Sequence, residues 1–401
     1  MIKNIIIVND FDYVQGGASK VAIQTANMLV KLKNDINVYF FSAVHSEEST
    51  LAKEVIKICT NQTESMKNKN KIQGIIDGLY NFKSKKKLKE LLKNLNNDET
   101  IIHVHGWTKS LSSSIFEVAF KMNFKVVLTM HDYFTACPNG GYFNYEKNEI
   151  CHLKPLSWKC IKCNCDSRNY RFKLYRVIRQ FIQNKIVKLN DKLSDVISIS
   201  EFSENILKET LNPKIKIHRV YNPIDLDNHV EKIDYTQNEY FLYVGRISKE
   251  KGVDIFCEAI TRSKLKGIVV GDGDERKKLE KEYPNITFTG WKNSNEVREY
   301  MKNAKALVFP SRWYETAGLT ALEAQKLQIP VIISNNTSTE EFALDKKFIF
   351  ENGNIEMLSE KMLNISEYHF IKFNEKKYSD ENYINGVIEV YGDILWKKSK
   401  D

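Results

Sequence analysis

Short apolar runs alternate with helical segments along this chain, and the alternation occurs twice. The first run lies between Met1 and Asp10, and it is too short for a signal peptide or a membrane span, so we expect a buried strand there. The pattern restarts after residues 220–225. Alternation of this kind is typical of parallel sheets covered by helices on both faces. The runs that we expect to form further strands are 36–41, 100–104, 125–130 and 195–199 in the first half, and 240–244, 267–270, 286–288, 306–309 and 331–333 in the second half.

With 401 residues, the chain is too long for one ordinary core. We predict an α/β protein of two doubly wound, Rossmann-like domains, 1–222 and 223–378, followed by a helical segment, 379–401, that packs back on the first domain. No stretch is apolar enough to span a membrane, which favours a cytoplasmic protein. The net charge of +9 indicates an anionic partner: a nucleotide, a nucleic acid or a lipid surface.

Two glutamates follow the apolar run at 306–309. Glu315 and Glu323 are eight positions apart, a little over two helical turns, so both carboxylates can project toward the carboxyl end of the second sheet. Ligands of open α/β sheets bind at that end, and carboxylates there can accept hydrogen bonds from sugar hydroxyls. The alternative is a solvated helix with two surface glutamates.

Three loops that follow predicted strands have the composition of phosphate-binding loops. The glycines of the first and third loops, which let a ligand or a neighbouring backbone approach, are Gly16, Gly17, Gly271 and Gly273. The second loop carries Arg246 and Lys251, and a guanidinium with an ammonium beside a helix start suits a diphosphate. For this loop the alternative is a charged surface turn.

These motifs resemble the donor half of the retaining glycosyltransferases of family 4, whose GT-B fold has two Rossmann-like domains facing a central cleft. The likeness covers nearly the whole chain, because other segments stand where that family has its glycine loop, its active-site histidine, the last strand of its first domain and its interdomain linker. These segments are Gly16-Gly17, His131-Asp132, 198–201 and 222–225. The chain departs from the family at Gln328, where a glycine is usual, and at 335–338, where a glycine pair is usual near the donor sugar.

The resemblance implies transfer of a sugar from a nucleotide-diphosphate sugar, with UDP or GDP as the nucleotide and with retention of anomeric configuration. Arg246 and Lys251 would bind the diphosphate and offset the charge of the leaving group, so that no catalytic metal is needed. Glu323 would hold the ribose and Glu315 the transferred sugar, and His131 would lie beside the reacting carbon. The donor-binding set that the resemblance implies is Gly16, Gly17, Arg246, Lys251, Gly271, Gly273, Glu315, Thr316, Ala317, Gly318, Leu319 and Glu323. The implied acceptor is a glycan or lipid-linked oligosaccharide of a bacterial capsule, O-antigen or wall polysaccharide.

Histidines end two predicted strands of the first half. His131 directly follows the run at 125–130, which places it at the carboxyl edge of the sheet, and its imidazole can act on a proton near neutral pH. His103 and His105 end another strand, with Trp107 beside them, and we assign these two histidines to the acceptor side of the cleft. The alternative for each histidine is a packed, hydrogen-bonded core residue.

Five of the seven cysteines lie in one insertion, 137–165, directly after His131-Asp132. Because the cytosol disfavours disulfides and the insertion has no strong apolar pattern of its own, a metal would stabilise it. We predict a structural zinc held by four thiolates, and reduced free thiols or a redox pair are the alternatives. The zinc ligands that we expect are Cys137, Cys151, Cys160 and Cys163, with Cys165 as a substitute.

The segment after the insertion, 168–182, combines arginines with an apolar helical face, and residues 83–93 form a second basic stretch. Basic and aromatic residues together suit the headgroup layer of an anionic membrane, which favours peripheral attachment at the inner face of the cell membrane. The alternative is that the apolar face packs on the first domain.

Other classes of function explain less of the chain. A zinc-ribbon nucleic-acid-binding protein would account for Cys160, Cys163 and the basic charge, but it leaves the two glutamates and the paired sheets unexplained. A GT-B-like sugar-nucleotide epimerase would use the donor without an acceptor. A dinucleotide oxidoreductase is disfavoured because no Gly-x-Gly-x-x-Gly follows the first strand. We therefore predict a glycosyltransferase that binds no nucleic acid.

Overall fold

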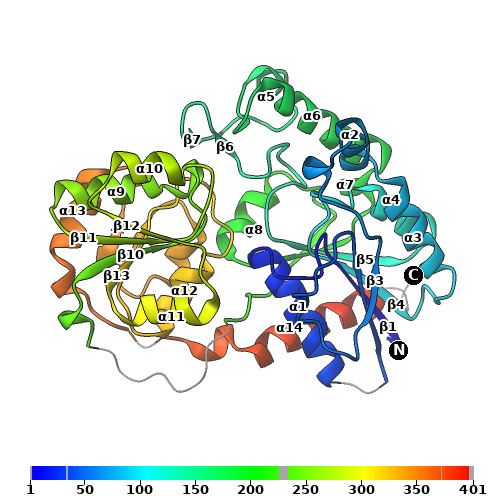
Figure 1. Ribbon diagram of the computed structural model, residues 1–401. Helices are drawn as coiled ribbons and strands as arrows, with labels where there is room; N and C mark the ends of the chain where they lie inside the picture. Colours follow the sequence, from blue (N-terminus) through cyan, green and yellow to red (C-terminus); the bar gives the residue numbers. More distant parts are fainter. Residues whose placement is uncertain (1, 33–34, 225–233, 372, 397–401) are drawn as a thin grey trace.

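The computed structural model describes residues 2–32, 35–224, 234–371 and 373–396, and it confirms the α/β fold with two parallel sheets (Figure 1). The interdomain linker expected at 222–225 extends to Asp225, which lies outside the described residues, as do residues 397–401 of the expected last segment. The helices of eight or more residues are α1 (Gly17–Leu32), α2 (Lys71–Leu79), α3 (Phe82–Leu92), α4 (Ser114–Lys121), α6 (Tyr170–Phe181), α8 (Glu201–Lys208), α9 (Val253–Arg262), α11 (Ser294–Lys302), α12 (Leu319–Lys326), α13 (Ile355–Leu363) and α14 (Asp380–Trp396). Shorter helices are α5 (Trp158–Lys162), α7 (Leu189–Lys192), α10 (Arg276–Glu282) and the π-helical turn η2 (Ile182–Ile186).

The first sheet has seven parallel strands in the order β3-β2-β1-β4-β5-β8-β9. In its centre β1 pairs with both β2 and β4, so that Ile6 lies opposite Tyr39 on one side and Ile102 on the other. The strands are β1 (Asn4–Val8), β2 (Asn37–Ser42), β3 (Ile56–Cys59), β4 (Thr100–Val104), β5 (Lys125–Met130), β8 (Asp195–Ser198) and β9 (Lys216–Arg219).

The second sheet has six parallel strands in the order β12-β11-β10-β13-β14-β15. They are β10 (Tyr240–Val244), β11 (Lys266–Val270), β12 (Thr287–Gly290), β13 (Ala304–Phe309), β14 (Val331–Ser334) and β15 (Ile349–Phe350). A small antiparallel pair, β6 (Phe143–Asn144) and β7 (Glu149–Ile150), lies in the cysteine-containing insertion. In the two parallel sheets three strands were not predicted, β3, β9 and β15, and all of them lie at the edge of a sheet. The strands of the small pair, β6 and β7, were not predicted either.

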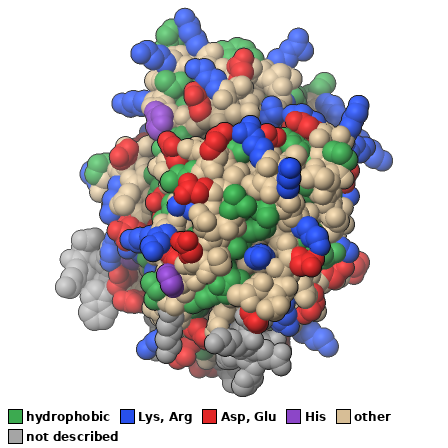
Figure 2. Space-filling model, turned by 90° about the vertical axis from the view of Figure 1, so that its left-hand side faces the viewer, with side chains coloured by type: hydrophobic (Ala, Val, Ile, Leu, Met, Phe, Trp, Pro, Cys, Tyr) green, Lys and Arg blue, Asp and Glu red, His purple; other side chains and the backbone are tan. Residues whose placement is uncertain are grey.

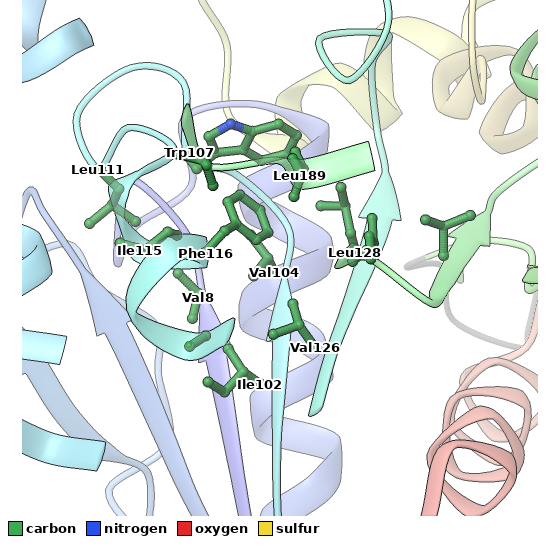
Figure 3. Packing of buried hydrophobic residues seen from close by; sticks show 14 of the residues in the cluster. Val8, Ile102, Val104, Trp107, Leu111, Ile115, Phe116, Val126, Leu128 and Leu189 are labelled. Carbon is green, nitrogen blue, oxygen red and sulfur yellow. The ribbon is translucent and has the colours of Figure 1, made fainter. Parts of the chain in front are cut away.

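Alternate residues of the first sheet face two separate cores, as the strand period requires. Ile6 and Val8 belong to the core on one side of the sheet, together with Trp107 and Phe116. Figure 3 shows Val8, Trp107 and Phe116 in this core. Ile5 and Ile7 point to the other side, where α1 and α14 cover the sheet. Because both faces are buried, the central strands read as continuous apolar runs in the sequence.

The last helix, α14, leaves the second domain and packs on the first (Figure 1). Its apolar side chains join the core of the first sheet. Two buried hydrogen bonds anchor it: the Tyr383 hydroxyl lies 2.6 Å from Thr25 Oγ1, and the Tyr391 hydroxyl lies 2.7 Å from His103 Nδ1. The residues that α14 contributes to this core are Tyr383, Ile384, Val387, Val390, Tyr391 and Ile394.

Basic and acidic side chains are interspersed on the face that Figure 2 shows, so the net positive charge does not gather there. Within the described part of the chain, no helix combines the length and the apolar character that a membrane span requires.

Candidate active site

A cavity of about 270 Å³ lies between the two domains, at the carboxyl ends of their central strands. The first domain contributes the start of α1 and the loop after β5, and the second domain contributes the loops after β10 and β13. The residues of the predicted site that line this cavity are Gly17, His131, Arg246, Lys251, Glu315, Thr316, Ala317, Gly318 and Leu319. Gly16, Gly271, Gly273 and Glu323 were predicted with them and do not line it.

Glu315 is buried beside the cavity, and one of its oxygens accepts three hydrogen bonds. Oε2 accepts from Lys251 Nζ at 2.5 Å, from Trp313 Nε1 at 3.0 Å and from Ser311 Oγ at 3.3 Å. The Lys251 ammonium and these hydrogen bonds outweigh the effect of burial and lower the pKa of Glu315, so the carboxylate is ionised at neutral pH. Among the described residues no group donates to Oε1, which leaves that oxygen able to accept from a ligand hydroxyl.

Trp313 was missed in the sequence although it lies two positions before Glu315. Its indole N–H holds the carboxylate, and the Lys251 ammonium lies 4.9 Å from its ring centre, a cation–π distance. A Cβ added at Gly141 would lie 2.8 Å from the Trp313 ring, so this glycine lets the insertion contact the ring closely. An aromatic residue beside a predicted sugar-binding glutamate was the available signal.

The glycines of the third loop serve the backbone of the Arg246 loop. A Cβ at Gly271 would lie 1.9 Å from the carbonyl oxygen of Gly245, and one at Gly273 would lie 2.2 Å from that of Ile247. These two glycines therefore let the loop after β11 pack on the loop after β10, which carries Arg246 to the cavity. The Arg246 guanidinium is 60% exposed and is paired with Glu250.

The helix that carries Glu323 begins later than predicted. α12 starts at Leu319, after Gly318 with φ = 60°, so Glu315 lies in the preceding loop and not on a helix face shared with Glu323. A Cβ at Gly318 would lie 2.2 Å from Thr339 Cγ2, which explains why glycine stands at this turn. Glu323 lies outside the cavity wall, where Lys20 of α1 contacts its carboxylate at 3.4 Å.

His131 lines the cavity with a neutral ring. Burial lowers its pKa to about 3, so at neutral pH the imidazole carries no charge. Its Nε2 lies 2.9 Å from Nδ1 of His105, and its backbone carbonyl accepts a hydrogen bond from Thr316 Oγ1 at 2.9 Å. Thr316 belongs to the second domain, so this hydrogen bond joins the two halves of the site.

The assignment of His103 to the acceptor side of the cleft was wrong. His103 is fully buried and bonds Tyr391 through Nδ1 and Thr129 through Nε2, at 2.7 and 2.6 Å. Trp107 packs edge-on against Phe116 in the core (Figure 3). His105 is buried too, and it reaches the site only through its contact with His131.

The structure does not assemble the predicted zinc site. In the part of the chain that the structure describes, no group of three or more His, Cys, Asp or Glu side chains could hold a metal ion. The buried ammonium of Lys173 instead lies 3.2 Å from the sulfur of Cys165 and 3.4 Å from that of Cys160. A fixed positive charge at two of the sulfurs does not fit a cation site. Cys137 donates to Asn139 at 3.1 Å, Cys163 accepts from Asn144 at 3.6 Å, and all of the cysteines are free thiols.

Fold and site together define a GT-B glycosyltransferase, and comparison with known proteins gives the family. Residues 15–228 match the model of Glycosyltransferase Family 4, and residues 227–378 match that of Glycosyl transferases group 1. The chain therefore belongs to glycosyltransferase family 4. This membership decides against the alternative classes of function considered from the sequence.

Relatives and solved structures extend the comparison. An uncharacterized 41.2 kDa protein in the cps region of Klebsiella pneumoniae is 29% identical over 327 residues, 73% of this chain and 87% of the relative. The O-antigen biosynthesis glycosyltransferase WclY of Escherichia coli is 26% identical over 264 residues, 62% of this chain and 63% of the relative. The crystal structure of Anabaena HepE in complex with UDP-glucose is similar in fold, with a TM-score of 0.58 at 14% identity, covering 99% of this chain and all of that chain.

Proposed function

We propose that this enzyme is a retaining glycosyltransferase that moves a sugar from a nucleotide-diphosphate sugar to a glycan acceptor during synthesis of a bacterial surface polysaccharide. The observation that carries the proposal is the cavity between the domains, which Lys251, Arg246 and an ionised Glu315 line together. Lys251 donates to Glu315 Oε2, and among the described residues no group donates to Oε1. The donor class is supported by the HepE complex with UDP-glucose, and the pathway by the relative named for O-antigen biosynthesis.

The residues around the cavity divide the chemistry between them. Arg246 and Lys251 bind the donor diphosphate and offset the charge that develops on the leaving group. Glu315 Oε1 accepts a hydroxyl of the transferred sugar, and Gly17, at the start of α1, lets the first domain approach the phosphates. Glu323 holds the ribose beside the cavity. The neutral His131 ring presents a hydrogen-bonding edge near the reacting carbon, and it does not act as a cation there.

The experiment that tests this function is a panel of UDP-, GDP-, ADP- and dTDP-sugars, followed by thermal unfolding and by release of nucleoside diphosphate. One donor should stabilise the wild type, and the stabilisation should disappear in Lys251→Ala. Lys277→Ala, which removes an exposed lysine of α10, is the matched control. Failure of every nucleotide sugar to shift the wild type would overturn the proposal.

We also propose that the enzyme works at the inner face of the cell membrane on a lipid-linked acceptor. Helices α2 and α6 contact each other (Figure 1). Each carries exposed apolar side chains at helical spacing. These side chains are Ile72, Ile75 and Ile76 of α2, and Leu174, Ile178 and Phe181 of α6, with Phe82 and Ile186 nearby in sequence. Sequence analysis gave packing of the apolar face of α6 on the first domain as the alternative, and these three side chains of α6 are exposed.

The surroundings of the two stripes favour an anionic bilayer. Exposed basic residues that flank these helices are Lys69, Lys71, Lys83, Lys86, Lys87, Arg171, Lys185 and Lys188. Apolar side chains that enter the headgroup layer with lysines around them bind anionic lipid by both effects. Co-sedimentation with phosphatidylglycerol vesicles should be lost in Ile178→Asp, and it should be retained in Leu363→Asp, which changes an exposed apolar residue of the second domain. Equal sedimentation of the two variants would refute this attachment surface.

A further inference from the structure

A second and larger cavity, of about 450 Å³, lies between the insertion with its following helix α6 and the second domain. It adjoins the donor cavity, because Arg246 lines both, and because Asp132 and Trp313 on its wall are next to His131 and Glu315 of the donor site. Its volume is that of ordinary small-molecule sites, roughly 300–1,000 Å³. A ligand in this cavity would therefore lie next to a sugar held by Glu315.

The wall from the first domain carries four basic side chains, Lys109, Arg168, Arg176 and Arg179. Arg176 is neutralised by the buried carboxylate of Asp166, at 2.6 Å. The other three form no ion pair with a carboxylate among the described residues. Lys109 and Arg168 lie instead over the rings of Phe11 and Phe172, at 5.4 and 4.5 Å from the ring centres.

Arg179 is the most informative of these cations. Its guanidinium lies 4.6 Å from the ring centre of Phe134 and donates to the carbonyl oxygens of Thr108 and Pro138, at 3.3 and 3.2 Å. Burial and the neighbouring Arg176 lower its pKa to about 10, against the opposing attraction of Tyr175, Asp132 and Asp10. The positive charge is therefore desolvated, and the contacts that hold the guanidinium in place are with neutral groups. Desolvated charges normally have an ionic partner, so a cation of this kind beside an open cavity indicates an anionic ligand.

The acidic residues of the cavity do not supply that partner. On the first domain's wall Glu64 is paired with Lys67 at 2.9 Å. Asp132 attracts Arg179 and Lys109 electrostatically, but it forms no ion pair with either of them among the described residues. Its carboxylate accepts the backbone N–H of Phe134 at 3.0 Å, and burial raises its pKa to about 6. On the facing wall Glu250 is paired with Arg246, Glu275 lies 3.9 Å from Lys278, and Asp274 is exposed. Lys249 adds another cation on that wall.

We infer that this second cavity binds the acceptor through an anionic group, placed against Arg179, Arg168 and Lys109. The inference rests on the proposed glycosyl transfer and names the class of its acceptor. Two sources can supply the anion: the diphosphate of a lipid-linked oligosaccharide, or the carboxylate of an acidic sugar. In either case the acceptor hydroxyl reaches the donor sugar past Arg246 and Trp313, where the two cavities meet.

The test uses the full chain saturated with the nucleoside diphosphate that stabilises it, so that Arg246 and Lys251 are already occupied. Calorimetric titrations with geranyl diphosphate and with methyl β-D-glucuronide represent the two anion sources, and methyl β-D-glucoside is the neutral probe. An anionic probe should bind while the neutral probe does not. Because a hydrogen bond to a charged group is worth roughly one to two factors of ten in affinity, Arg168→Gln and Lys109→Gln should each weaken that probe about tenfold or more.

Controls separate this inference from the function on which it rests. Lys159→Gln removes an exposed cation of α5, in the same insertion but outside the cavity, and it should bind the probe as the wild type does. Arg179→Gln should abolish probe binding. If this variant does not fold, Arg168→Gln and Lys109→Gln, at more exposed positions, still test the inference. Absence of nucleotide binding to the wild type would overturn the proposed function. Normal nucleotide binding with no anionic probe bound, or with probe displaced by the nucleotide, would overturn the acceptor inference alone.

Discussion

The substitution Glu315→Gln removes the negative charge of the proposed sugar-binding side chain and keeps its size and shape. All three donors, Lys251, Trp313 and Ser311, address the same oxygen, Oε2. A glutamine carbonyl in that position can accept the same three hydrogen bonds. The amide nitrogen then takes the place of Oε1, and the site loses both its negative charge and the acceptor that we propose for the sugar hydroxyl.

The sizes of the two effects follow from this geometry. A hydrogen bond to a charged group contributes about 1.5–3 kcal/mol and a neutral one about 1 kcal/mol, so the variant should lose about 1–2 kcal/mol of unfolding free energy. Loss of one charged acceptor for a sugar hydroxyl costs about 1.5–3 kcal/mol in the transition state, which is a decrease in kcat/KM of roughly 10- to 150-fold.

Release of nucleoside diphosphate from the preferred nucleotide sugar measures the activity, and urea unfolding measures the stability. The pKa of Glu315 in the folded protein lies below its ordinary value of 4.5, so its stabilisation is complete above that pH and is lost as the pH falls through the folded pKa. The stability difference between wild type and variant should therefore shrink in acid. The control is Glu360→Gln, at an exposed position of α13. A kcat/KM within about threefold of the wild type in a folded variant would refute the role of Glu315.

Three more changes probe other parts of the structure. Tyr391→Phe leaves buried His103 Nδ1 without a partner and should cost about 1–3 kcal/mol of unfolding free energy, whereas an unchanged urea midpoint would contradict the anchoring role of this hydrogen bond. Gly318→Ala places a Cβ at φ = 60° and 2.2 Å from Thr339 Cγ2, so thermal unfolding should show a loss of about 1–2 kcal/mol of unfolding free energy, and the donor should bind more weakly. A variant as stable as the wild type would be inconsistent with this turn. Chelation with EDTA should leave the melting temperature of the purified protein unchanged, because Lys173 occupies the position between two of the thiols; a zinc-containing protein that loses stability on chelation would restore the metal prediction.

The central strands were predictable because they are buried on both faces. More than half of the residues of β1, β4 and β5 are apolar, and the positions of these strands along the chain are visible in the sequence. The edge strands β3, β9 and β15 were not predictable in this way. β9 reads Lys-Ile-His-Arg and is largely open to solvent, while β15 has only two residues, so neither shows a run or a period.

Only those parts of the site that lie close together in the sequence were predictable. Arg246 and Lys251 stand close together in the sequence, their resemblance to a family motif singled them out, and both line the cavity. The partner of Lys251 is 64 positions away, and no local pattern indicates that contact. His103 bonds a tyrosine 288 positions away, which is why a strand-end histidine was mistaken for a ligand of the cleft. Lys173 is fully buried although lysines are almost always exposed. The sequence therefore gave no sign that its ammonium lies among the cysteines, and the cysteines alone suggested a zinc site.

The position of α14 determines when this enzyme can finish folding during synthesis. The first sheet is complete in the nascent chain once β9 has emerged at Arg219, but the helix that covers one of its faces begins at Asp380, 161 residues later. At about 5–20 residues per second, a ribosome needs roughly 10–30 s to add them. Throughout that interval Ile5, Ile7 and Val127 lack the cover that α14 supplies. A chain that stops before α14 therefore exposes apolar surface on this face of the sheet, which is prone to aggregation. We expect chaperones to bind the ribosome-bound intermediate through this surface.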